Sequence, residues 1–97
     1  MELFNEIRDM VFASDSRPKK IQVIVSEHHS GESVSCFRVF GSSSGIHGPQ
    51  IPTPFTMDLK PHESAVLIFC SPGHKELMDA VVELIGLEEN IMVEDAP

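Results

Sequence analysis

Residues 65–86, AVLIFCSPGHKELMDAVVELIG, place an apolar strand directly before an amphipathic helix. Residues 65–70 are apolar without alternation, which predicts a central strand covered on both faces. Ser71 is a typical N-cap residue, and Pro72 suits the first turn of a helix. The helix should end at Gly86 as a C-terminal cap. Its predicted apolar stripe consists of Leu77, Ala80, Val81, Leu84 and Ile85.

The rest of the chain supplies further elements on both sides of this unit. Residues 2–13 repeat apolar side chains at helical spacing and predict an amphipathic helix. Residues 21–26 and 33–40 are rich in β-branched and aromatic residues and predict two strands joined by a hairpin connection at 27–32. Residues 55–60 alternate and predict a strand with one wet face. Residues 88–97 predict either an acidic tail or a short final strand.

This order predicts one α+β domain over residues 1–97. We expect a two-layer sandwich, in which an antiparallel four-stranded meander is flanked by an N-terminal and a C-terminal helix (α-β-β-β-β-α). Residues 33–40 carry apolar side chains on both faces of their strand, so the second sheet face also needs cover. A twin subunit or the long loop at 41–54 would provide it. We therefore expect a homodimer.

The charge of the chain favours a protein partner over a nucleic acid or a membrane. The formal net charge is −8, and no basic residue follows Lys75. Such a surface repels phosphate backbones and anionic lipids. The acids are expected either to be a solvated face or to steer a basic protein partner. The residues assigned to partner binding are Ile51, Pro52, Phe55, Glu76, Asp79 and Glu83.

The chain is expected to be a soluble cytoplasmic protein. It has no apolar run long enough to cross a bilayer, and its N-terminus has acids where a signal peptide begins with basic residues. The two cysteines, Cys36 and Cys70, lie within apolar runs and are expected to behave as small buried hydrophobes. This usage favours a reducing compartment.

The loop at 41–54, GSSSGIHGPQIPTP, is long for a connection between strands and is a candidate binding segment. Ser43, Ser44 and His47 could present hydroxyl, ring and backbone donors to an anion, although no phosphate-binding lysine motif accompanies them. The prolines that follow favour polyproline II, which suits either a stiff connector or a ligand for an aromatic groove. A semi-rigid flap for a protein or neutral ligand is the preferred interpretation.

The turn at residues 70–74 is the other candidate ligand site, because it lies where a central strand meets a helix N-terminus. Cys70, Ser71, Gly73 and His74 would line it. A helix N-terminus attracts anions and can lower a thiol pKa. Capping by Ser71 and burial of Cys70 explain the same residues without a ligand.

The sequence shows no catalytic triad, paired-carboxylate or cofactor motif, so no cofactor is predicted. A small enzyme that uses Cys70 and His74 stays open as the weakest of three hypotheses. The five histidines lack metal-ligand spacing, and no metal is expected. The order of elements is similar to that of frataxin-like proteins and secretion chaperones and, in part, of double-stranded RNA-binding domains, a likeness of layout that does not carry function. The leading hypothesis is a small acidic protein-interaction or regulatory module. The alternative is a binding protein for a small anionic ligand or metal ion that uses the 41–54 loop and the 70–74 turn.

Overall fold

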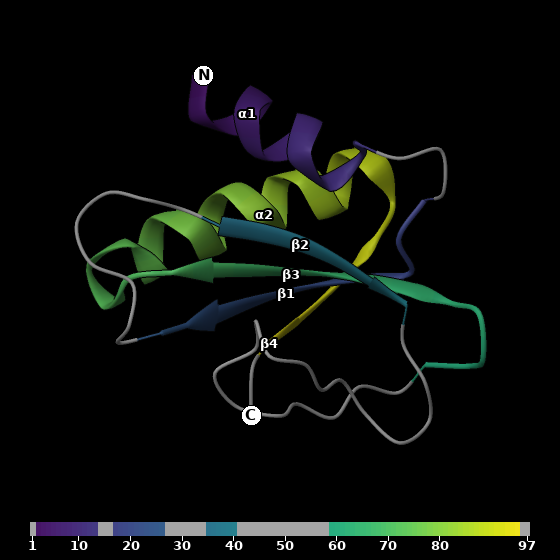
Figure 1. Cartoon of the computed structure of the whole chain (residues 1–97). Coiled ribbons are helices and arrows are strands. Elements are labelled where there is room, and N and C mark those ends of the chain that lie inside the picture. Colours follow the sequence, from purple (N-terminus) through teal and green to yellow (C-terminus); the bar gives the residue numbers. More distant parts are fainter. Residues whose placement is uncertain (1, 14–16, 27–34, 41–58, 96–97) are drawn as a thin grey trace.

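A computed structural model of the chain describes residues 2–13, 17–26, 35–40 and 59–95. The elements follow the order shown in Figure 1. They are α1 (Glu2–Val11), β1 (Lys20–Val25), β2 (Ser35–Phe40), β3 (Ser64–Cys70), a 3-10 turn η1 (Pro72–His74), α2 (Lys75–Glu89) and β4 (Met92–Asp95). The α+β class predicted from the sequence is confirmed.

The sheet is mixed, and the predicted antiparallel meander is wrong. Its strand order is β2-β3-β1-β4. β1 pairs in parallel with both β3 and β4, while β2 pairs antiparallel with β3. β3 thus separates β1 from β2, and the predicted hairpin does not form. The α2 crossover gives β3 and β4 a common direction, since a helix between two strands of one sheet returns the chain parallel to its start. β1 is inserted between these two strands and pairs with both, which leaves β2 on the far side of β3.

The fourth described strand is β4 and not the segment predicted at 55–60. Residues 55–58 lie outside the described residues, and Leu59 and Lys60 are not in a strand. β4 pairs with β1 from Lys20 opposite Met92 to Val23 opposite Asp95. An ion pair of 3.0 Å joins Lys20 Nζ to Glu94 Oε2, and the Lys20 side chain is only 8% exposed. The final strand is therefore held to β1 by both backbone and charge.

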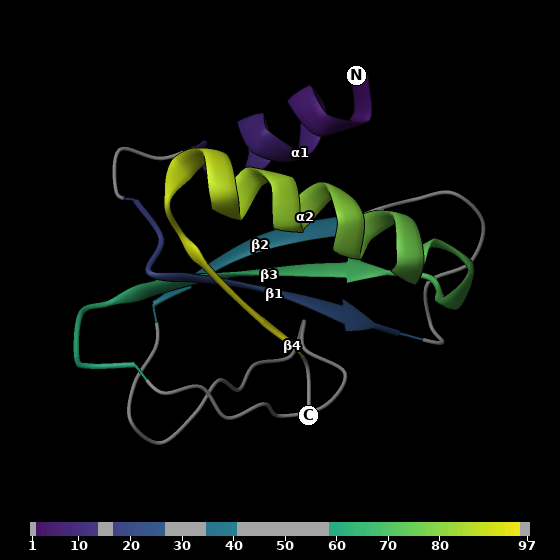
Figure 2. The ribbon, with the colours of Figure 1, turned by 180° about the vertical axis from the view of Figure 1, so that it is seen from behind.

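Both helices cover the same face of the sheet, and the main core lies between them and the strands (Figures 1 and 2). Side chains of β1 and β3 that point to this face alternate with those that point away, as the pleat requires. Arg38 of β2 donates a hydrogen bond to the carbonyl oxygen of Val11 at the end of α1. The buried residues of this core are Ile7, Val11, Ile21, Val23, Val66, Ile68, Cys70, Met78, Val81, Val82, Ile85 and Ile91.

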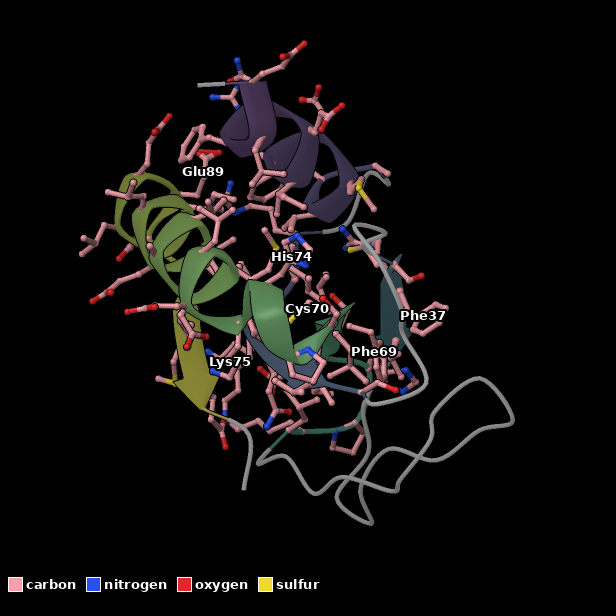
Figure 3. The ribbon with its side chains drawn as sticks, turned by 90° about the vertical axis from the view of Figure 1, so that its left-hand side faces the viewer. Phe37, Phe69, Cys70, His74, Lys75 and Glu89 are labelled. Atoms are coloured by element: carbon pink, nitrogen blue, oxygen red, sulfur yellow. The ribbon has the colours of Figure 1, made fainter. Side chains whose placement is uncertain are left out.

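The opposite face of the sheet carries a second apolar cluster. Phe37 and Phe69 meet there edge to face, with ring centroids 5.1 Å apart, on the side turned away from α2 (Figure 3). The buried members are Ile24, Leu59, Ala65, Leu67 and Phe69. Because these side chains are buried within a single chain, this face of the sheet does not require a twin subunit to cover it. Self-association needs other support.

Gly86 has a different role from the cap predicted for it. It lies inside α2, which ends at Asn90 in the left-handed conformation (φ 55°, ψ 51°). The backbone N–H groups of Asn90 and Ile91 both donate to the Gly86 carbonyl oxygen. A Cβ at position 86 would lie 2.6 Å from Val93 Cγ2 and 2.9 Å from the Ile91 carbonyl oxygen. Glycine is needed there because β4 passes close to the helix.

Candidate functional site

The turn between β3 and α2 holds Cys70, Ser71, Gly73 and His74, the part of the predicted ligand site that the structure describes. Cys70 and His74 are labelled in Figure 3. The N–H of Ser26 donates to the Cys70 carbonyl oxygen over 3.0 Å, so the carboxyl ends of β1 and β3 meet at this edge. Parallel strands often place ligand sites at such an edge. Whether this edge of the sheet can bind a ligand or react with one depends on the hydrogen bonds and the pKa values of its side chains.

Ser71 and His74 form a hydrogen-bonded pair. Ser71 Oγ lies 2.6 Å from His74 Nδ1, and Ser71 is buried. The hydroxyl makes no side-chain cap to η1, so the predicted capping role is wrong. The backbone instead closes the turn through His74 N–H donating to the Ser71 carbonyl oxygen over 3.0 Å. Because the hydroxyl and the imidazole bond to each other, the pair stabilises the turn between β3 and α2.

Both cysteine thiols are held in the protonated form. Burial raises the pKa of Cys70, while the nearby Lys75 ammonium lowers it and Asp79 raises it. Burial raises the pKa of Cys36 to about 11, against a smaller lowering by Arg38. A thiolate is the reactive species, so these shifts work against a nucleophilic role. Cys70 is fully buried in the helix-side core, where it acts as a small apolar side chain.

The other half of the predicted ligand site and part of the predicted partner site cannot be placed. Ser43, Ser44, His47, Ile51, Pro52 and Phe55 all lie outside the described residues. Among residues 2–13, 17–26, 35–40 and 59–95, no three His, Cys, Asp or Glu side chains gather into a group that could hold a metal ion. In that part of the chain, no helix is long and apolar enough to span a membrane.

The outer face of α2 carries an exposed apolar stripe, defined by Leu77, Ala80, Leu84 and Leu87. The leucines are 45%, 51% and 77% exposed, in chain order, and Ala80 is also exposed. Their spacing of three, four and three residues places them along one side of a helix, as at the a and d positions of a coiled coil. The opposite side holds Met78, Val82 and Ile85, which are buried in the core. The helix α2 therefore has two apolar faces, of which one is unused by the described fold.

The single apolar stripe predicted from the sequence combines residues of both faces. Leu77, Ala80 and Leu84 are exposed, whereas Val81 and Ile85 are buried together with Met78 and Val82. A signal was present, since α2 has more apolar positions than one core-facing stripe needs. An amphipathic helix with apolar residues on two sides is typical of a helix that packs on both.

Acidic side chains flank the exposed stripe. Glu76 and Glu83 are exposed on one side of it, and Glu88 lies on the other. Glu88 is joined to Arg8 of α1 by an ion pair of 3.4 Å. Asp79, the remaining predicted partner residue on α2, bonds to Lys75 over 2.5 Å and does not border the stripe. Two of the three acids predicted for partner binding, Glu76 and Glu83, thus lie beside the exposed apolar residues.

A groove of about 590 Å³ opens beside the end of α2 and the start of β4. Arg17, on the segment that leads into β1, donates a hydrogen bond to the Glu89 carbonyl oxygen and stacks over the Phe12 ring. Lys19 Nζ forms an ion pair of 3.8 Å with Glu63 Oε2. The lining residues are Arg17, Pro18, Lys19, Glu83, Gly86, Leu87, Asn90, Ile91, Met92 and Val93. The groove therefore combines basic, acidic and apolar groups.

No protein-family model, no curated protein and no solved structure matches this chain. Its function must be inferred from the surfaces described above.

Proposed function

We propose that this chain is a protein-interaction module that binds a basic amphipathic helix of a partner protein along the exposed stripe of α2. The observation that carries the proposal is the stripe itself, Leu77, Ala80, Leu84 and Leu87 at a and d spacing. Exposed apolar side chains that lie contiguously on a small domain are typical of an interaction surface.

The shape of the stripe favours a helix as the bound element. From Leu77 to Leu87 it extends about 15 Å along α2, at 1.5 Å per residue. A partner helix of two to three heptads would place its own apolar residues between those of α2. α2 is fixed from behind by Met78, Val82 and Ile85 in the core, so little order is lost on binding.

The charges beside the stripe favour a basic partner. Glu76 and Glu83 would face the flanking positions of a bound helix on one side of the stripe, while Glu88 on the other side is already paired with Arg8 of α1. Lysine or arginine at those positions would pair with them, as in the e and g contacts of a coiled coil. Two α2 faces packed together would bring these acids against one another. The stripe is therefore better suited to a foreign helix than to a second copy.

The proposal can be tested with a synthetic peptide about three heptads long, with leucine at a and d and arginine at e and g. Added to the ¹⁵N-labelled full chain, it should shift the amide signals of the outer face of α2 and bind more weakly as salt rises. A Leu84→Glu variant should lose binding by at least about tenfold, since a buried leucine contributes about 1.5 to 3 kcal/mol.

The matched control is Met92→Glu, which makes the same chemical change at an exposed apolar residue on β4. It should bind the peptide as the wild type does. A peptide with glutamate at e and g supplies the charge control and should bind far more weakly. Equal binding of the two peptides would exclude the proposed preference for a basic partner. Signal shifts away from α2 would exclude the proposed surface.

A further inference from the structure

We infer that the outer edge of β4 pairs antiparallel with the same strand of a second copy, so that two four-stranded sheets join into one across a two-fold axis. Among the described strands, β4 lies at one end of the order β2-β3-β1-β4 and pairs with β1 alone. An edge strand presents unpaired backbone N–H and C=O groups that can template another strand.

Exposed apolar side chains lie at this edge. Met92 is 58% exposed and Val93 36% exposed, and both line the groove together with Leu87. Pairing at the edge would cover them at the same time as it satisfies the backbone groups. The strand is also held firmly in place, because Lys20 and Glu94 form their 3.0 Å ion pair and Val93 packs on Gly86. A fixed strand loses little conformational freedom when a second strand adds to it.

The order of residues in β4 favours a second copy in the antiparallel sense. The strand begins with two apolar residues, Met92 and Val93, and ends with two acids, Glu94 and Asp95. If the two strands pair about Val93, Glu94 of each copy lies opposite Met92 of the other. A parallel pair would set acid beside acid, and like charges directly opposite are destabilising.

The groove beside the start of β4 supplies the complementary charge. Arg17 and Lys19 line it together with Met92 and one acid, Glu83. Lys19 Nζ also lies 3.8 Å from Glu63 Oε2, and the groove keeps an excess of basic over acidic side chains. In the antiparallel pair, the acidic end of one β4 arrives beside the start of the other and therefore near these two bases. The same attraction occurs twice, related by the two-fold axis, which is the self-complementarity that a closed dimer requires. The β4 edge thus has both acidic and basic side chains nearby, whereas the stripe on α2 is flanked by acids.

The test is the oligomeric state of the full chain by sedimentation equilibrium. The wild type should reach a mass of about 21 kDa, twice the 10.7 kDa of one chain. Met92→Glu sets a carboxylate opposite Glu94 at both symmetric positions and should weaken the dimer by roughly tenfold or more. Arg17→Glu should also weaken it, because the complementary charge is reversed.

The matched control is Leu84→Glu, which should leave the dimer intact while abolishing peptide binding. Isotope-filtered NOEs between β4 backbone protons of two differently labelled copies should be present in the wild type. Circular dichroism confirms that each variant is folded. A mass of 10.7 kDa for the folded wild type at millimolar concentration would overturn the inference. So would a dimer that Leu84→Glu dissociates and Met92→Glu does not.

Discussion

Replacing Gly86 by alanine should destabilise the protein, although alanine is the better helix former. Gly86 lies in the last turns of α2, where a new Cβ would stand 2.6 Å from Val93 Cγ2 and 2.9 Å from the Ile91 carbonyl oxygen. Non-bonded carbon atoms have their optimal separation at about 3.5 to 4.0 Å, and real Cβ atoms essentially never approach another heavy atom to within 3.0 Å. The Val93 methyl can move, but the Ile91 backbone is held by its hydrogen bond of 2.9 Å to the Gly86 carbonyl oxygen. Relief therefore requires β4 to shift away from α2.

The expected size follows from two opposing terms. Alanine in place of glycine gains about 1 kcal/mol of helix propensity. Overpacking of this kind costs about 1 to 3 kcal/mol, and a backbone contact favours the upper part of that range. The net loss should be about 1 to 2 kcal/mol. For a domain of this size each kcal/mol lowers Tm by roughly 4 to 8 °C.

Urea unfolding followed by circular dichroism measures the effect, with Gly73→Ala as the matched control. A Cβ at position 73 would meet no heavy atom within 4 Å. That variant should gain about 0.4 to 1 kcal/mol, because alanine restricts the unfolded chain. Hydrogen exchange should show β4 losing protection first in Gly86→Ala. A Gly86→Ala variant as stable as the wild type, or more stable, would refute the role assigned to this contact.

The remaining predictions concern the Cys36 thiol and the ion pair between Lys20 and Glu94. Cys36, which is half-buried and has its pKa raised from 9.0 to about 11, should react with iodoacetamide near pH 8 about 100 times more slowly in the native chain than in urea. Equal rates would contradict the raised pKa of this thiol. Because this pKa is higher in the folded state, its contribution to stability is complete below pH 9 and is lost as pH rises through about 11. Urea midpoints should fall over that interval, and less so in Cys36→Ala. Glu94→Gln should cost about 1 to 2 kcal/mol, since it leaves the buried Lys20 ammonium without its carboxylate, whereas Lys20→Met should be nearly neutral. Thermal unfolding of the two variants compares them, and a Lys20→Met variant less stable than Glu94→Gln would contradict the cost assigned to an unpaired Lys20 ammonium.

The candidate surfaces could be predicted only in part. The acidity of α2 is legible in the sequence, and Glu76 and Glu83 do border the exposed stripe. The predicted stripe on α2 combined exposed and buried residues. Spacing shows which residues share a helix face, but not which face meets the sheet. Leu77 and Leu84 are as apolar as Met78 and Val82, yet only the latter pair is buried. The contact with the strands decides between them.

The sequence by itself determined the α+β class, the acidic surface and the approximate positions of β1, β2, β3 and both helices. These follow from local period and turn chemistry. Only the tertiary structure decided the mixed sheet, the place of β4 at its edge and the close contact at Gly86. Strand partners are chosen by contacts between residues far apart in the chain, such as Lys20 with Met92. A periodic pattern records which side of a strand is apolar, but it holds no information on which strand lies beside it.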